Sequence, residues 1–362
     1  MANTAINEFT PDYAVHPGEI LDETLDARGI KKVAFAKRCG LSDKTISQII
    51  SGVAPVTYDT AIQFERVLGV SAAVWSNLET NYRLHIAKAA AKRKLSKQSL
   101  LTKRFPVKDL VKRGMIATPY NKVDAVEKLF SFFGVGNADA LESYLNEMSA
   151  AFRSSKSFKS NPASVSAWLR LGDIYAEQID IVPYDKNRLI ANLGDIRKLT
   201  TQSPEIFEPK MKELCRTAGV ALVFVSEFDK TYLSGATRWL NKDKALIMLS
   251  LRYKSDDHLW FSFFHEAAHV LLHGKRQMFL DELNMNNTPS EKEANEFSAN
   301  FLIPEKEYTA FVRNEKFTKA SVIDFANRIE TAPGIVVGRL QHDKHIGYNW
   351  LNALKRKFTL VE

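Results

Sequence analysis

The chain has 362 residues, enough for two or three domains, and its 45% apolar content is typical of a globular protein. Lys and Arg outnumber Asp and Glu by 50 to 42, and the net charge of +8 fits a nucleic-acid partner. Two cysteines are too few for a disulfide framework, the first residues are too polar for a signal peptide, and no apolar run approaches the ~18 residues of a membrane span. We therefore expect a cytoplasmic protein and exclude the membrane and secreted classes.

The first part of the chain is predicted to be a bundle of short helices. Apolar residues recur at helical spacing over residues 18–27, 33–39, 43–51, 58–68 and 72–85. Gly29 and Gly52 end the first and third of these segments, and Ser42 is a natural N-cap for the third. Two short helices joined by a glycine-containing turn, the second polar on its exposed face, are typical of a helix-turn-helix.

In a helix-turn-helix, the second helix enters the major groove with its N-terminal residues against the base edges. The candidate DNA contacts there are Lys44, Thr45 and Gln48. Glutamine can bind adenine through two hydrogen bonds and lysine can reach guanine, while Lys32 at the start of the preceding helix could hold a phosphate. The alternative is the ordinary solvated face of a helical bundle.

Three stretches favour the DNA-binding alternative, because together they resemble the HigA-type antitoxins of the Xre helix-turn-helix class. They are His16-Pro17-Gly18-Glu19-Ile20-Leu21, Cys39-Gly40-Leu41-Ser42-x-Lys44-Thr45-Ile46-Ser47 and Trp75-x-Asn77-Leu78-x-x-Asn81-Tyr82. The resemblance implies a λ-repressor-like bundle, a homodimer on palindromic double-stranded operator DNA, and repression of the protein's own operon. Lys32 and Asp43 depart from the residues usual in this class, which leaves the operator sequence open.

The middle of the chain begins with a basic run. Residues 88–113 contain ten Lys or Arg and one acid, Asp109, so they could add phosphate contacts or form a solvated linker helix. Residues 122–216 show helical periodicity and no chemistry-bearing motif. We expect a DNA-binding domain over residues 1–90, a basic linker and helical middle region over 91–200, and a further domain over 201–362.

The periodicity then changes to that of strands. Residues 220–225 and 245–249 are short apolar or β-branched runs, and Gly235 to Trp239 lies between them as an expected edge strand. We hypothesise that this edge holds an extended peptide. The whole chain is expected to be mainly α with a small β-sheet, an α+β fold.

A helix after these strands carries the strongest motif of the chain. In His265-Glu266-x-x-His269 the two histidines, four residues apart, project from one helix face and can bind one zinc ion, while Glu266 can take a proton from water. The surrounding residues are apolar nearly all round, which indicates a buried helix. Histidines packed in the core with a solvated Glu266 are the alternative. His273 precedes an expected C-cap, Gly274, and is interpreted as a last-turn histidine.

The third zinc ligand is expected downstream, where three glutamates compete. Thr288, Pro289 and Glu291 fit a capping box, which gives Glu291 a structural role. Measured from the apolar stripe of the helix, Glu296 points away and Glu293 can reach inward. Glu293 is therefore predicted to be the ligand, with a surface glutamate as the alternative.

These two segments resemble the ImmA/IrrE-type metallopeptidases. The resemblance covers about residues 201–345 and is carried by His265-Glu266-x-x-His269, Glu291-x-Glu293-Ala294-Asn295-x-Phe297 and Leu302-Ile303-Pro304. It implies a zincin-like fold, zinc, and a protein substrate, usually a repressor. We expect a DNA-binding regulator fused to a zinc metallopeptidase that cleaves a repressor or toxin. The alternative is an antitoxin and autorepressor that neutralises a toxin by binding, with a sensory or inactive peptidase-like domain.

Overall fold

The computed structural model describes residues 13–152, 160–250, 252–275, 278–281, 288–314 and 316–358. The chain divides into two compact units, Met1–Ser99 and Leu100–Glu362. The boundaries expected at residues 90 and 200 stay predictions. Within the described ranges, no helix is both long and apolar enough to cross a membrane.

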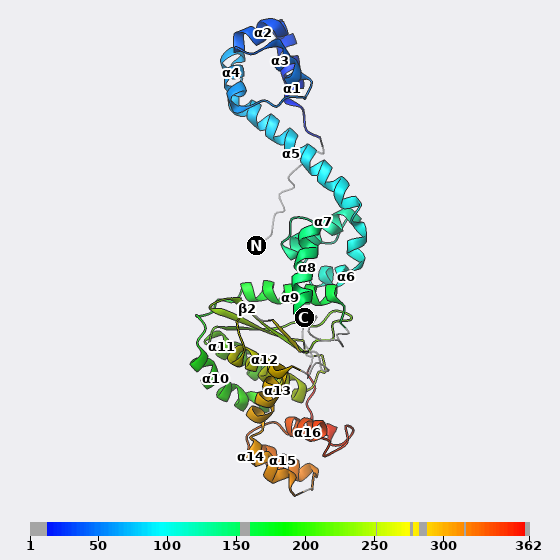
Figure 1. Ribbon diagram of the computed structural model, residues 1–362, viewed down its shortest axis with the longest axis vertical. Coiled ribbons are helices and arrows are strands. Elements are labelled where there is room, and N and C mark those ends of the chain that lie inside the picture. Colours follow the sequence, from blue (N-terminus) through cyan, green and yellow to red (C-terminus); the bar gives the residue numbers. More distant parts are fainter. Residues whose placement is uncertain are drawn as a thin grey trace. The chain divides into compact units, whose positions relative to one another are not determined.

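The first unit is a helical bundle, as expected (Figure 1). Its helices are α1 (Pro17–Ala27), α2 (Lys32–Cys39), α3 (Asp43–Ile50), α4 (Tyr58–Leu68) and α5 (Ala72–Ser96). Helix α5 is longer than the segment 72–85 that periodicity predicts. Its second half is exposed and lacks an apolar face, so this half gives no periodic pattern in the sequence. Fully buried Leu21, Phe35, Ile46, Phe64 and Trp75 form the centre of the bundle core.

Local contacts explain why α1 and α3 pack together. His16 is the N-cap of α1, and its Nδ1 accepts a hydrogen bond of 3.0 Å from the Gly18 N–H. A Cβ atom on Gly18 would lie 2.3 Å from the carbonyl oxygen of Ile49 in α3, so only glycine permits this approach. Ser42 caps α3 by accepting a hydrogen bond of 3.1 Å from the Thr45 N–H.

The second unit is an α+β domain, which confirms the expected fold class. Helices before the sheet are α6 (Val107–Lys112), α7 (Lys122–Phe133), α8 (Ala138–Phe152), α9 (Pro162–Glu177), α10 (Lys186–Lys198) and α11 (Pro204–Arg216). The strands are β1 (Val220–Phe224), β2 (Gly235–Asn241), β3 (Lys244–Leu249) and β4 (Phe279–Asp281). The remaining helices are α12 (Asp256–Leu272), α13 (Pro289–Leu302), α14 (Glu305–Val312), α15 (Lys319–Arg328) and α16 (Pro333–His342).

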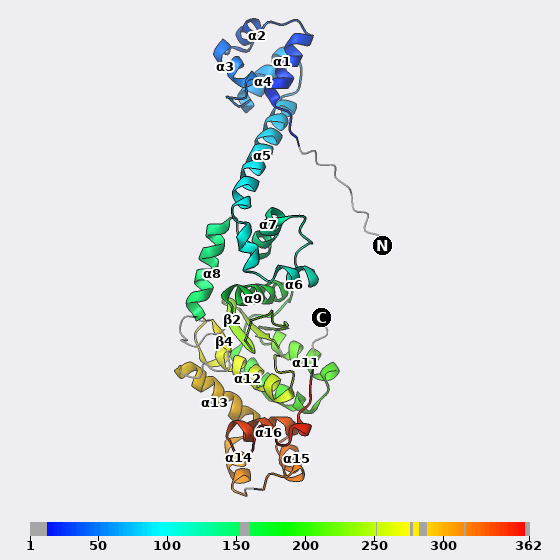
Figure 2. The ribbon, with the colours of Figure 1, turned by 90° about the vertical axis from the view of Figure 1, so that its right-hand side faces the viewer.

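The strands whose residues are described form one sheet in the order β1-β3-β2-β4. Strand β1 runs parallel to β3, and β2 runs antiparallel to both β3 and β4. Helix α9 covers one face, and α11 and α12 cover the other (Figures 1 and 2). Leu222 and Ile247 point into the core on the α12 side, whereas Met248 points at Gly172 of α9. This alternation is the two-residue period of a sheet that is covered on both faces.

The expectation that Gly235 to Trp239 forms an edge strand is wrong. Strand β4 pairs with β2 from Gly235↔Asp281 to Thr237↔Phe279, so β4 occupies that edge next to α12. Strand β4 has three residues and is too short to show the two-residue alternation by which strands are predicted from a sequence.

The N-terminus of α12 is held by the C-terminal segment. Asp256 and Asp257 are both buried, and they pair with Arg356 at 3.3 Å and Lys355 at 2.6 Å respectively. Burial raises the pKa of Asp256, and the Arg356 side chain and backbone oppose that rise. The two acids therefore fix the start of α12, in addition to the favourable interaction with the helix dipole that the sequence predicts.

Candidate functional site

Helix α12 carries the motif in a dry environment. Because it packs against the sheet on one side and α13 and α16 on others, most of its residues are buried, as expected. His265, Glu266 and His269 are 2%, 0% and 1% exposed. Polar side chains at such burial carry a large desolvation cost unless they are paired or bind a ligand.

Two histidines and one glutamate converge on a single point. The Nε2 atoms of His265 and His269 are 3.0 Å apart. The Glu291 carboxylate lies 3.2 Å from Nε2 of His265 and 3.5 Å from Nε2 of His269. One ligand atom from each residue falls within 4.8 Å of the others. The position expected for the third carboxylate is therefore occupied by Glu291.

The selection of Glu293 is corrected by this geometry. Its carboxylate lies 3.2 Å from Nε2 of His273 instead, and its side chain is 63% exposed. The face of α13 that is buried runs through Ala294, Ser298 and Leu302. At about 100° per residue, Glu291 is about 20° from the centre of that face and Glu293 about 140° from it. The Thr288 half of the predicted capping box forms, through the Glu291 N–H at 3.3 Å. The structural role predicted for the Glu291 side chain is wrong, because its carboxylate faces the histidines instead.

Asn295 fixes the orientation of the first histidine, and sequence reasoning missed it. Its Oδ1 lies 3.0 Å from Nδ1 of His265. An amide oxygen only accepts hydrogen bonds, so Nδ1 of His265 carries a proton, and a neutral ring then has its lone pair on Nε2. This is the tautomer that a metal-binding Nε2 requires. Asn295 lies four residues after Glu291 and therefore on the same helix face, and this spacing is the signal by which the sequence could have indicated it.

The second histidine is enclosed by aromatic rings. Phe279 of β4 stacks on His269 with ring centroids 4.0 Å apart. Burial, with smaller contributions from His265 and His273, lowers the pKa of His269 to about 2. His269 is therefore neutral near pH 7, as a ligand must be. His273 is itself the C-cap residue of α12, so the expectation that Gly274 caps the helix is wrong.

The Glu266 carboxylate packs against β2. A Cβ atom on Gly235 would lie 2.6 Å from Oε1 of Glu266, so the absence of a side chain at residue 235 makes room for the carboxylate. The Thr237 hydroxyl donates a hydrogen bond of 3.1 Å to the Glu266 carbonyl oxygen, which ties the same turn of α12 to β2. Strand β2 thereby sets the position of the acid beside the convergent donors.

The donor set fits a zinc ion. Ligand distances of about 2.0–2.2 Å in a tetrahedral site place donor atoms about 3.3–3.6 Å from one another. The distances here are 3.0, 3.2 and 3.5 Å. Two neutral imidazoles and one carboxylate are also the ligand types of catalytic zinc sites. His265, His269 and Glu291 can therefore hold zinc with little rearrangement.

The candidate DNA contacts lie on α3 and α2 of the first unit. Lys44 is exposed, and Thr45 and Gln48 are half-buried at the surface of α3. The Thr45 hydroxyl lies 2.8 Å from the Ser42 hydroxyl, so it takes part in the helix cap. Lys32 is paired with Asp22 at 2.7 Å, and a phosphate would compete with that acid for its ammonium group.

Fold and site together define a class: a helix-turn-helix unit joined to an α+β unit with an H-E-x-x-H helix. The family model of the helix-turn-helix matches residues 21–75, and the model of the IrrE N-terminal-like domain (peptidase M78) matches residues 218–339. These matches place a helix-turn-helix domain in the N-terminal part of the chain and an IrrE N-terminal-like domain in its C-terminal part.

Relatives of known sequence and structure match about a fifth of the chain. It is 39% identical over 75 residues to virulence-associated protein I of Dichelobacter nodosus, a match that covers 20% of this chain and 69% of the relative. It is 32% identical over 68 residues to the uncharacterized HTH-type transcriptional regulator YddM of Escherichia coli K12, covering 19% and 72%. The antitoxin HigA of Pseudomonas aeruginosa, solved with the higBA promoter, is 35% identical over 23% of this chain and 90% of its own, with a TM-score of 0.22. A HigA-family antidote protein of Coxiella burnetii is 27% identical, covering 23% and 91%, also with a TM-score of 0.22.

Proposed function

We propose that this protein is a DNA-binding transcriptional regulator whose second unit hydrolyses a peptide bond in a protein target with the help of zinc. The observation that carries the proposal is the convergence of the His265, His269 and Glu291 donor atoms beside the buried Glu266. When bound, zinc activates water as a nucleophile and polarises the carbonyl that is attacked.

The roles of the chain's own residues follow from their positions. His265 and His269 offer neutral Nε2 lone pairs, and Glu291 supplies a negative charge that offsets part of the charge of the ion. Glu266 accepts a proton from the attacking water and can return it to the leaving amine. Burial of α12 excludes other water, and low local polarity strengthens both electrostatic effects.

The first unit supports the regulatory half of the proposal. Helix α3 presents Lys44 at its N-terminal end, the end that enters the major groove in a helix-turn-helix, and Gln48 follows one turn later on the same face. Lys32 would add a phosphate contact, in exchange for its pair with Asp22. We propose a homodimer on a palindromic operator, because two copies of one recognition helix match two half-sites.

The first test is the zinc content of the purified full chain by elemental analysis. We expect about one zinc per chain, lost in His265→Ala and retained in Glu266→Gln, since only the first removes a ligand. A wild-type protein without zinc, isolated in the presence of added zinc, would refute the metal centre.

The second test separates a peptidase from an antitoxin that acts by binding alone. Cells that express the wild type or Glu266→Gln are compared for new protein N-termini by mass spectrometry. A peptidase produces N-termini that are absent with Glu266→Gln, whereas the two strains stay identical if the protein only binds a toxin and its own operator. Gel-shift assays of both proteins on the promoter DNA control for equal DNA binding.

A further inference from the structure

His269 has a second polar partner that leads away from the candidate metal position. Its Nε2 faces His265 and Glu291, while its Nδ1 lies 2.9 Å from Nδ1 of His273. Nε2 of His273 in turn lies 3.2 Å from Oε2 of Glu293. The four residues from Glu291 to His269, His273 and Glu293 thus form a continuous path of contacts across the end of α12.

Both ends of this path are carboxylates, Glu291 and Glu293. With a metal ion at the point where the ligand atoms converge, Glu291 and Nε2 of His269 would bind the ion, and Glu293 would then set the direction of the remaining hydrogen bonds. A carboxylate only accepts, so His273 must donate from Nε2, and its Nδ1 then carries a lone pair. That lone pair accepts the proton on Nδ1 of His269. His269 is left with a lone pair on Nε2, directed at the point where the ligand atoms converge.

We propose that His273 and Glu293 are positioning residues that hold His269 in its metal-binding tautomer and ring orientation. This inference rests on the proposed function, since it assigns the support of a zinc ligand. Asn295 contacts Nδ1 of His265, and the His273–Glu293 pair supports His269 through two successive contacts. Such partners of a metal-bound histidine typically change metal affinity by about 10- to 100-fold when they are removed.

The fold restricts His273 to this role. Its backbone is extended at the end of α12, with φ −111° and ψ 165°, and its N–H still donates to the His269 carbonyl oxygen at 3.2 Å. Phe279 lies against both imidazoles, with centroid distances of 4.0 Å to His269 and 5.1 Å to His273. The His273 side chain is 9% exposed, so its ring has little freedom to rotate away.

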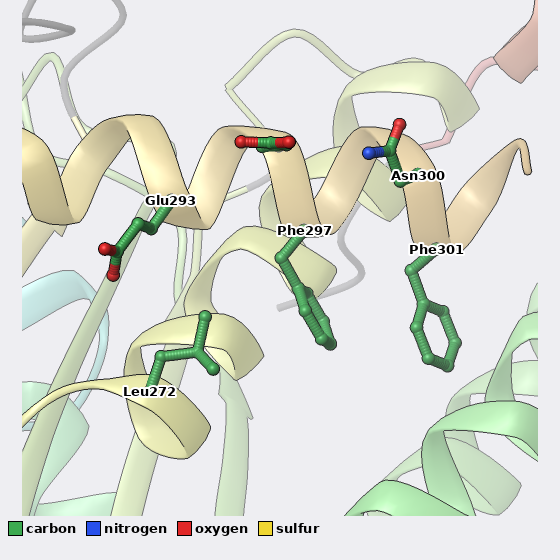
Figure 3. Close-up of a pocket in the computed structure, with 6 residues that line it drawn as sticks. Leu272, Glu293, Phe297, Asn300 and Phe301 are labelled. Carbon is green, nitrogen blue, oxygen red and sulfur yellow. The ribbon is translucent and has the colours of Figure 1, made fainter. Parts of the chain in front are cut away.

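Glu293 reaches this path from α13. Figure 3 shows Glu293 on the helix that also carries Phe297 and Phe301, extending toward the side of Leu272 at the end of α12. An exposed carboxylate paired with a histidine adds little to stability by itself. Its effect is expected on the metal, because it fixes which nitrogen of His273 donates.

The experiment measures the zinc affinity of the full chain by competition with a chromophoric chelator. His273→Leu removes the acceptor for His269 and should weaken zinc binding about 10- to 100-fold. His273→Asn keeps an oxygen near the position of Nδ1, so it should recover most of that loss. Glu293→Ala should weaken binding by a smaller factor, and Glu296→Ala, an exposed acid on the same helix, should leave it unchanged.

A second readout reports the tautomer directly. In long-range proton–nitrogen spectra of the zinc-loaded protein with ¹⁵N-labelled histidine, the Nδ1–H signal of His269 should be protected from exchange in the wild type and in His273→Asn. It should be lost in His273→Leu. Melting curves of the metal-free variants show whether each one is folded, and Glu293→Ala, at the surface, provides a variant that folding defects do not confound.

The outcomes separate the two proposals. If the wild type binds zinc and the variants His273→Leu and Glu293→Ala bind it equally well, the positioning role is overturned and the metal centre stays intact. A wild type that binds no zinc overturns the metal centre and the positioning role with it.

Discussion

Replacement of Glu291 by alanine should remove most of the zinc affinity. Its carboxylate lies 3.2 Å and 3.5 Å from the two Nε2 atoms, and its side chain is only 13% exposed, so it is placed to bind an ion at a position shielded from water. Four-ligand zinc sites bind with about 10–16 kcal/mol, or about 2.5–4 kcal/mol per ligand. Loss of one ligand therefore corresponds to about two to three orders of magnitude in affinity.

Glu293→Ala is the matched variant for this prediction, because it removes the same side chain two residues away on the same helix. Chelator competition on both variants should give a much larger loss for Glu291→Ala than for Glu293→Ala. Circular dichroism of the metal-free proteins controls for folding of α13. If Glu293→Ala abolished binding and Glu291→Ala preserved it, the reasoning from the donor positions would be refuted and the prediction from the sequence would be restored.

Three further predictions address the base, the DNA contacts and the metal-free site. Gly235→Ala should displace the Glu266 carboxylate and reduce peptide-bond cleavage by about 10²-fold or more while zinc content stays unchanged; equal loss of zinc would contradict this. Gln48→Ala should cost about 1–3 kcal/mol of operator binding and relax base preference at one position, and Lys44→Ala should act at a neighbouring one, as measured by selection from randomised operators at fixed salt. Because the pKa of His269 is lowered to about 2, the unfolded chain binds a proton that the folded metal-free protein does not. The free energy of unfolding of the metal-free protein should therefore decrease as the pH is lowered below about 6.5, by about 1 kcal/mol between pH 6.5 and 5.5. Chemical denaturation across that range should show a weaker dependence of this free energy on pH in a His269 variant.

The helices of the first unit are largely predictable because each one has a local start and stop signal. Ser42 begins α3 through its hydroxyl, and Gly40 ends α2 with a φ of 69°, a conformation that favours glycine. For the C-terminal half of α5 the sequence left a solvated linker helix and phosphate contacts as open alternatives, because its exposed residues give no amphipathic pattern, although lysine, alanine and leucine favour helix by propensity. The pairing of β4 with β2 joins residues about forty positions apart, and no local signal reports such a contact.

The two histidines and Glu266 could be found from spacing alone, whereas the choice between Glu291 and Glu293 depended on which side of α13 faces α12. Two residues apart on a helix project about 200° from one another, so both acids cannot point at the same histidine pair. The large apolar residues Phe297 and Phe301 suggested the wrong side, since they are only partly buried and line an open groove (Figure 3).

The close contact between α13 and α12 is marked by a small residue. The Ser298 hydroxyl donates a hydrogen bond of 2.9 Å to the Phe261 carbonyl oxygen, an approach that a larger side chain would prevent. Ser298 lies seven residues, or about two helical turns, after Glu291, so both project from the same face. In α13, the small buried residues therefore mark the face that carries Glu291, whereas the aromatic residues do not. The acid on the opposite side, Glu293, reaches the site only through His273.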